Sequence, residues 1–538
     1  MWCSDYCFGY GYPYFCLYGP LGFYVGALYH FVLGLDFGSA AKLSFYTSLY
    51  LSGALMYAFA YLIGRREGWP RAPWWALAAA TIYALTRYHF TDLFVRSALG
   101  ECWAWTMLPG VFWGMELTRR RALRGSLLVS AAYAGLLLSH NITALWGSIF
   151  IAAYVPLTAR NLRWPAAVAG GGVLGIALAA FFWYPALTLS KLTRHAGDVM
   201  TMWGSPQQIH THAIYWQQHF MESLGYGNSI AGPDDSLGIN LGFAVLIGAS
   251  LSTLAVFRPG FTSYQRRRVA SLLFVFAGLL FIMSPQMSWS MVPALFRYIQ
   301  FPWRLLVFTA FFGAAATAMA SPVLDRWIHP GVLVGLAILF SIPTLPLTLM
   351  PSVIKTMPPE RLAKWNLRWE RRGLYGGSAV QDFIPKWVSG DYLDPRFLAD
   401  HPIPANRLTV TSGELFCDRY VHRGNSYEYS YQAAADSTAT VAVFYWPGWE
   451  LRIDGKPAKN IPEADEHGLV VLHVPAGQHV AELRYTLSPQ GKKGRLISLV
   501  ATLVWLGLLG FHRLTLGRSG RGTRRDTAER MIRPTIAA

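Results

Sequence analysis

Residues 40–63 read AAKLSFYTSLYLSGALMYAFAYLI and are followed at 64–71 by GRREGWPR. The first stretch is apolar over a length that crosses a bilayer as a helix, for which about 17–25 residues are needed. The second stretch carries three arginines and one glutamate. Together they predict a membrane-spanning helix that ends in a basic loop.

Similar apolar runs recur along the chain. We expect about eleven transmembrane helices, at 40–63, 72–87, 97–117, 124–139, 142–158, 164–185, 237–257, 269–284, 304–322, 330–350 and 496–512. The composition agrees, because 53% of the residues are hydrophobic and only 14% are charged, against about 25% charged residues in soluble domains. This composition excludes a disordered chain and argues against a cytosolic enzyme.

The excess positive charge lies in one alternate set of connections. The formal charge of +17 is carried by 64–71, 118–124, 158–163, 258–268, 323–329 and the tail 513–538. The positive-inside rule places this set in the cytoplasm, and a basic membrane face also suits anionic membrane lipids. We therefore predict a multi-pass protein of the bacterial cytoplasmic membrane with a cytoplasmic C-terminal tail, and no nucleic acid as a partner.

The remaining connections are expected on the extracytoplasmic side. They are 1–39, 88–96, 186–236, 285–303 and 351–495. Residues 1–39 are predicted to form a loop rich in Gly, Pro and Tyr, with an interfacial helix at 20–34. No signal peptide or span precedes this loop to carry it outward, so we expect an upstream first helix to be missing from this sequence. Residues 40–350 form the transmembrane domain of this prediction.

Residues 351–495 have a different pattern, in which apolar and polar residues alternate. Such alternation, rich in Thr, Val and Tyr, predicts β-strands at 427–431, 438–445, 469–474 and 480–487. Asp454-Gly455 suits a hairpin turn. We expect an extracytoplasmic β-sandwich-like domain before the last helix. Its aromatic run 444–449 either fills the core or presents rings to sugars, and the core is the favoured interpretation.

Ionisable residues at the ends of spans are candidates for function, because burying them costs several kcal/mol unless they are paired. The densest group lies in RYHFTDLFVR, residues 87–96, and Glu101 follows in the next span. Asp92 and Arg96 are four residues apart, share a helix face and can pair. Glu101 lies about 140° further around a helix, so it joins them only if the backbone is irregular. A salt bridge that anchors the helix end is the alternative to a functional site.

Two further groups lie at expected outer ends of helices. His140 and Asn141 either line a cavity or act as interfacial hydrogen-bonding residues. Gln300, Trp303 and Arg304 belong to QFPWR, in which a proline suits the first turn of a helix. A helix N-terminus beside an arginine suits a phosphate, whereas snorkelling to the interface is the alternative for Arg304.

The histidines at 210, 212 and 219 do not share one face of a regular helix or strand. We therefore expect no metal site. We also expect no cofactor, with a divalent cation as the open alternative.

Several motifs resemble one family of bacterial polytopic membrane proteins. The family is labelled by a 6-pyruvoyl-tetrahydropterin-synthase-related domain. The motifs are FGYGYPYF, YGPLGFYVGALYH, YHFTDLFVRSALGE, LLLSHNITAL, FFWYPAL, IQFPWRLL, FYWPGWELRIDG and VPAGQHVAELRY. The label itself implies no pterin chemistry, since a compact zinc enzyme does not fit a chain of eleven spans. The layout is similar to that of GT-C superfamily glycosyltransferases.

This resemblance implies transfer of a sugar from a polyprenyl-phosphate carrier to an extracytoplasmic glycan or glycolipid acceptor. Asp92 or Glu101 would then supply the acidic residue of the second external loop, and Arg96 and Arg304 would hold phosphate. GT-C enzymes normally carry their principal base soon after the first helix, where Asp5 is the remaining carboxylate near the aromatic motif. The alternative that this chain has no transferase activity therefore stays open. The alternative function is a non-catalytic assembly or accessory protein for cell-surface polysaccharide, and a transporter is third.

Overall fold

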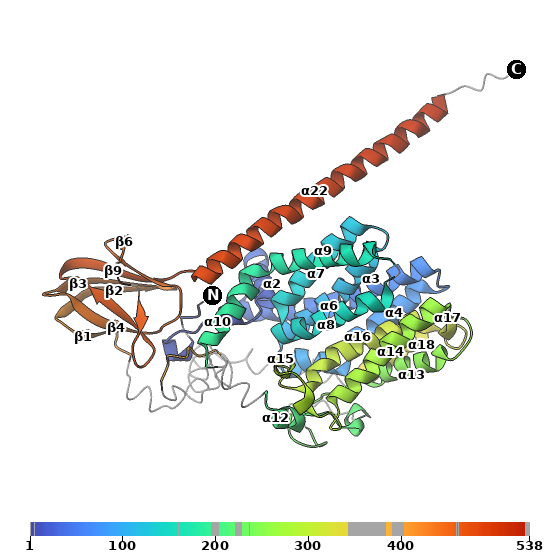
Figure 1. Cartoon of the computed structure of the whole chain (residues 1–538), viewed down its shortest axis with the longest axis horizontal. Helices are drawn as coiled ribbons and strands as arrows, with labels where there is room; N and C mark the ends of the chain where they lie inside the picture. The colour runs from blue at the N-terminus through green and yellow to red at the C-terminus, as the bar shows by residue number, and fades with distance from the viewer. Residues whose placement is uncertain are drawn as a thin grey trace.

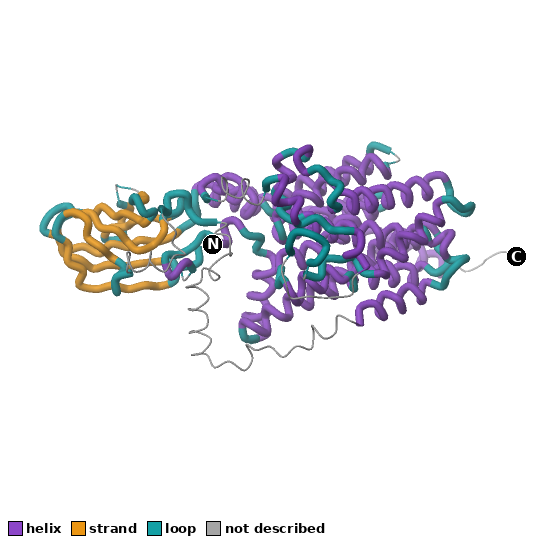
Figure 2. The backbone as a smooth tube through the Cα atoms, turned by 90° about the horizontal axis from the view of Figure 1, so that it is seen from below, coloured by secondary structure: helices purple, strands orange, loops and turns teal. Residues whose placement is uncertain are grey.

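The computed structural model has a helical body, an antiparallel β-domain beside one end of it, and a long C-terminal helix that starts near the β-domain (Figure 1). The structure describes residues 2–4, 6–159, 161–194, 204–220, 229–235, 237–342, 383–389, 403–458, 460 and 462–532. Figure 2 shows that the strands and the helical body form separate masses. The described part of the chain is therefore mainly helical, with a C-terminal antiparallel β-domain.

The helices of the body lie both in the predicted spans and in the predicted connections. They are α2 (Leu21–Leu33), α3 (Phe37–Glu67), α4 (Ala72–Ala84), α5 (Arg87–Phe90), α6 (Leu99–Thr118), α7 (Ala122–Ser139), α8 (Asn141–Thr158), α9 (Arg163–Leu178), α10 (Ala180–Leu189), α12 (Pro206–Thr211), α13 (Phe243–Val256), α14 (Ser263–Met283), α15 (Ala294–Arg297), α16 (Leu306–Met319), α17 (Ser321–Leu324) and α18 (Pro330–Ser341). Each of the eleven predicted segments contains a helix, and α2 lies where the interfacial helix is expected.

Within the described part of the chain, five helices are long and apolar enough to cross a membrane. They are α3, α7, α8, the helix Pro302–Met319 and the segment Pro489–Leu514. The count becomes six if the bent pair α9 and α10 forms one span. Large apolar side chains on α2 and α3 are left exposed by the fold, among them Phe31 (82% exposed) and Phe37 (76%). Exposed apolar surface of this kind fits contact with lipid.

The predicted span 164–185 is not one straight helix. It breaks at Ala179 into α9 and α10, which meet at an angle of 70°. The hydroxyl of Ser498 accepts a hydrogen bond from the Phe181 N–H at 2.8 Å and donates one to the Ala177 carbonyl at 3.1 Å. A side chain that inserts into the helix ladder in this way satisfies the backbone groups freed by the bend.

The last helix is longer than predicted. It runs without a break from Pro489 to Ile532 as α22, and therefore includes part of the tail expected after 512. Its apolar stretch has many exposed leucines and valines, such as Leu496 and Leu503, each 62% exposed. Most of this apolar stretch is exposed, as expected for a helix that contacts lipid.

The β-domain contains two antiparallel sheets. Its strands are β1 (Leu408–Ser412), β2 (Leu415–Arg423), β3 (Ser426–Ala433), β4 (Ser437–Phe444), β5 (Trp449–Ile453), β6 (Lys456–Pro457), β7 (Glu463–Ala464), β8 (Leu469–Val474) and β9 (Gly477–Tyr485). The sheet orders are β1-β4-β8-β7 and β2-β3-β9-β5-β6. The four predicted strands correspond to β3, β4, β8 and β9. The turn at Asp454-Gly455 joins β5 to β6 with both residues at positive φ, as a type I′ hairpin requires.

The aromatic run of the β-domain fills its core. Phe444, Trp446 and Trp449 are all at least 97% buried, so the favoured interpretation of this run is confirmed. These rings are not available to stack on a sugar. Any binding surface of this domain has to be made from other residues.

The N-terminal segment is part of the β-domain core rather than a separate loop. The ring of Trp2 meets that of Trp449 edge-on at 5.4 Å, and Tyr10 stacks on Phe444 at 5.1 Å. The Phe444 N–H donates to the Tyr10 carbonyl at 2.7 Å. The predicted unit 1–39 is therefore divided between two bodies: its first residues pack into the β-domain, and α2 packs against α3.

Candidate functional site

The predicted pair Asp92 and Arg96 forms an ion pair, and Glu101 joins it. Arg96 Nη1 contacts Asp92 Oδ1 and lies 2.9 Å from Glu101 Oε2. The backbone between them is irregular: Thr91–Val95 is a π-helical turn, labelled η2, and Ser97 has a φ of +51°. These two departures bring the Glu101 carboxylate back to Arg96, which a regular helix would prevent. Both carboxylates are at least 99% buried.

Aromatic side chains hold this triad. The Tyr88 hydroxyl donates to Glu101 Oε1 at 2.6 Å and accepts from Arg96 Nη1 at 2.8 Å. Trp105 Nε1 donates to Asp92 Oδ2 at 3.1 Å. The Arg96 guanidinium also lies 4.5 Å from the ring centroid of Trp303, a cation–π distance. The buried charges are thus both paired and hydrogen-bonded.

One guanidinium faces two carboxylates in this triad. Burial first, and the Glu101 charge second, raise the pKa of Asp92 to about 8, although Arg96 opposes the change. Ionisation of the Asp92 carboxyl is therefore less favourable in the folded chain than in the unfolded one. Because its pKa is higher in the folded state, the contribution of Asp92 to stability falls as the pH rises. A carboxyl group that titrates near neutral pH is also suited to proton transfer.

Arg304 lies beside the triad and has a different set of partners. Its Nη1 donates to the Ile299 carbonyl at 3.1 Å and to Gln300 Oε1 at 2.8 Å. Its guanidinium lies 5.8 Å from the Trp303 ring centroid, so Arg96 and Arg304 approach the same indole. Gln300 reaches this position with a φ of +61°. Pro302 begins a 3-10 turn, η6 (Pro302–Leu305), that leads into α16, as its sequence predicts.

Arg304 differs from Arg96 in its charged partners, because Glu101 acts on it electrostatically without forming an ion pair with it. In the described ranges, no Asp or Glu forms an ion pair with it, and its buried Nε has no hydrogen-bond partner there. The side chain is partly exposed. This combination leaves the guanidinium with capacity to bind an anion.

The first loop closes over the same region. Asn141 Nδ2 donates to the Leu17 carbonyl at 2.9 Å, and Gly19 packs directly against the Ser139 carbonyl. Tyr18 follows Leu17 and interacts electrostatically with Arg304, Arg96 and Glu101. Asn141 therefore positions a loop. Tyr18 is a further site residue, which no sequence motif indicates.

The remaining predicted residues lie as follows. His140 Nδ1 is 2.8 Å from Thr143 Oγ1, and the imidazole also interacts electrostatically with Glu101. Asp5 lies outside the described residues, so its candidate role as a base stays a prediction. His212 is 2.9 Å from Ser229 Oγ through Nδ1. The part of the chain that the structure describes contains no group of three His, Cys, Asp or Glu that could hold a metal.

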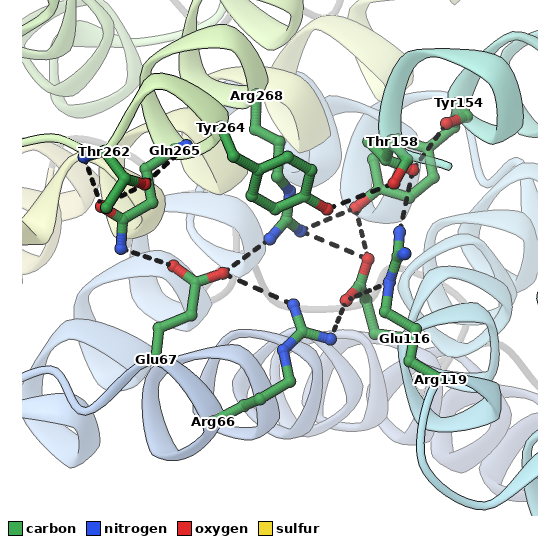
Figure 3. A network of polar contacts seen from close by, with 10 residues as sticks. All are labelled: Arg66, Glu67, Glu116, Arg119, Tyr154, Thr158, Thr262, Tyr264, Gln265 and Arg268. Carbon is green, nitrogen blue, oxygen red and sulfur yellow. Dashed lines mark hydrogen bonds and ion pairs between the residues drawn. The ribbon is translucent and has the colours of Figure 1, made fainter. Parts of the chain in front are cut away.

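A second buried cluster of charges was not predicted (Figure 3). Glu116 lies at its centre, is 2% exposed, and contacts Arg66, Arg119 at 3.0 Å and Arg268 at 3.2 Å. Arg268 also reaches Glu67 at 2.8 Å. The cluster joins α3, α6 and α14, and Tyr154 of α8 donates to Glu116 at 2.9 Å. Its arginines belong to connections that the charge pattern assigns to the cytoplasmic side.

One feature of the sequence could have indicated this cluster. Glu116 is an acidic residue inside a predicted span, which by itself marks a candidate. Its partners at 66 and 268 are 50 and 152 residues away along the chain. No local spacing indicates such pairs. Tyr88 and Trp105, the hydrogen-bonding partners of the first triad, lie within or close to the motif that drew attention to Asp92.

No family model matches the chain, and no solved structure matches it. The chain is similar to an uncharacterized protein of Lactococcus lactis subsp. cremoris (strain MG1363), with 25% identity over 187 residues. The match covers 33% of this chain, and the chain spans only 30% of that relative's length.

Proposed function

We propose that this chain is an integral membrane glycosyltransferase of the GT-C type. It would move a sugar from a polyprenyl-phosphate carrier to an extracytoplasmic glycan or glycolipid. The observation that carries the proposal is Arg304, a partly exposed guanidinium with no carboxylate partner among the described residues, beside two buried carboxylates at the mouth of a helix. The exposed apolar side chains of α2 and α3 supply a surface for the lipid tail.

The proposal assigns a role to each charged group. An acceptor hydroxyl attacks the anomeric carbon, its proton passes to a carboxylate, and the bond from that carbon to the phosphate oxygen breaks. Asp92 or Glu101 supplies the carboxylate, with Asp92 able to exchange its proton near neutral pH. Arg304, aided by Arg96, stabilises the negative charge that grows on the leaving polyprenyl phosphate. The products are the glycosylated acceptor and the free polyprenyl phosphate.

We also infer how the chain is arranged in the membrane. Eleven spans would place the Asp92–Arg96–Glu101 triad and Arg304 at the extracytoplasmic leaflet and the Glu116 cluster at the cytoplasmic leaflet. The separation of the +17 charge into alternate loops supports this arrangement. The β-domain would then stand outside the cell, next to the acceptor.

Carrier binding provides the direct test. We expect Arg304→Ala to weaken binding of farnesyl phosphate to the purified full chain by about 10- to 100-fold, because charge-assisted hydrogen bonds contribute about 1.5–3 kcal/mol. Lys191→Ala, which removes an exposed cation from the same expected side, should bind like the wild type. Farnesol, which has no phosphate, should bind weakly to the wild type and to both variants. Equal binding of farnesyl phosphate to Arg304→Ala and wild type contradicts the role of Arg304.

A second observation favours the non-catalytic alternative. Asp92 and Glu101 are both tied to Arg96, so neither carboxylate is unpaired in this structure. An accessory protein would bind the carrier lipid and make no product. The test is the amount of cell-surface glycan made by cells that carry Asp92→Asn or Glu101→Gln. A normal amount of glycan, with carrier binding retained, supports this alternative over sugar transfer.

A further inference from the structure

A groove of about 660 Å³ lies on the β-domain, where the first strand of each sheet meets the ends of β3 and β9. Val410 and Glu414 form part of its rim, and Phe416, Gln432 and Gln478 line it. None of these residues belongs to the candidate site described above. The groove is open to solvent, so a ligand can reach it without a change in the fold.

Three of the lining side chains form a row across neighbouring strands. Phe416 of β2 is paired with Gln432 of β3, and Gln432 is paired with Gln478 of β9. All three are exposed, whereas Tyr431 and Ala433 beside Gln432 are buried. The row therefore lies on the outer face of the sheet. Adjacent strands are about 4.8 Å apart, so the row extends about 10 Å, the length of two sugar units.

The chemistry of this row fits one class of ligand. Phe416 is 69% exposed, which leaves an aromatic ring face open beside Val410, itself 38% exposed. Each glutamine side chain offers two donors and an acceptor, the complement of sugar hydroxyls. Of the residues that line the groove, Glu414 alone is charged, and it is an acid. The groove therefore disfavours polyanions and does not need a charged ligand.

We propose that this groove binds a neutral oligosaccharide, with the apolar face of one sugar on Phe416 and hydroxyls of the next on Gln432 and Gln478. The site differs from the buried aromatic run at 444–449, which has no free ring face. Glycan binding here does not depend on the transfer reaction. Only the further identification of this glycan as the acceptor rests on the proposed function.

Binding to the purified full chain tests the site. We expect at least one of cellotetraose, chitotetraose and maltotetraose to bind saturably, and Phe416→Ala to weaken that binding at least tenfold. Gln432→Ala and Gln478→Ala should each weaken it several-fold. Val480→Ala is the matched control, because Val480 is an apolar residue on the same strand as Gln478, 40% exposed, and outside the groove lining.

The outcomes separate this inference from the proposed function. Phe416→Ala should bind farnesyl phosphate like the wild type, and Arg304→Ala should keep its tetrasaccharide binding. The inference is overturned if none of the three tetrasaccharides binds, if Phe416→Ala and Val480→Ala lose binding equally, or if long-chain polyphosphate competes for the groove. The exposure of Phe416 makes misfolding of Phe416→Ala detectable as a lowered melting temperature, in which case Gln432→Ala with Gln478→Ala decides the result.

Discussion

Glu116→Ala is expected to destabilise the helical body by about 3–5 kcal/mol, the usual result of removing one partner from a buried ion pair. Glu116 accepts from three arginines and from Tyr154. Its removal leaves Arg268, which is 98% buried, with only Glu67 as a carboxylate partner in the described ranges. A buried cation without enough negative charge nearby destabilises the folded state by more than the loss of one hydrogen bond does.

The measurement is the thermal unfolding of the full chain in detergent. The melting temperature of Glu116→Ala should fall by several degrees or more. Arg71→Ala is the matched control: its pair with Asp325, at 3.3 Å, is partly exposed, and exposed pairs contribute about 0–1 kcal/mol. Similar melting temperatures for Glu116→Ala and Arg71→Ala would show that the cluster does not hold the helices together.

Gly19→Ala should release the first loop from the site. A methyl group at Gly19 would overlap the backbone oxygen of Ser139, at the end of α7. That oxygen cannot rotate away as a side chain could, so the loop itself has to move, and overpacking of this kind costs about 1–3 kcal/mol. Tyr18 would then leave its position near Arg304 and Glu101.

Limited digestion with chymotrypsin measures this release. We expect cleavage after Tyr18 to become at least tenfold faster in Gly19→Ala, with a matching loss of farnesyl phosphate binding. Gly26→Ala is the control in the next helix, because a methyl group there meets no atom closer than 3.9 Å. Unchanged cleavage and unchanged binding in Gly19→Ala would mean that the contact with Ser139 does not position the loop.

The sequence predicts the positions of the helices and of four strands well, for simple reasons. Long apolar runs and period-two alternation are local properties of the sequence. Contact with lipid, or burial in a protein core, favours these patterns directly. The Asp92–Arg96 pair is predictable because four residues make one turn of helix. Each of these features depends on residues close together in the chain.

The rest of the site depends on backbone irregularities and long-range contacts that the local sequence pattern does not indicate. Glu101 reaches Arg96 only through a π-helical turn and the positive φ of Ser97, and neither is indicated by residue type. Trp2 packs on Trp449 across nearly the whole chain. The break at Ala179 is stabilised by Ser498, more than 300 residues later. Tertiary packing decides these contacts.

We propose that the two buried charged clusters lie on opposite sides of a membrane. Single cysteines at Ser290 and Ser263, both exposed, in a full chain whose five native cysteines are replaced by serine, report the side of each. With a membrane-impermeant maleimide on intact cells, we expect Ser290→Cys to be labelled and Ser263→Cys to be labelled only after permeabilisation. Labelling of Ser263→Cys in intact cells, or protection of Ser290→Cys, would contradict the claim and place the Arg304 site away from an extracytoplasmic carrier.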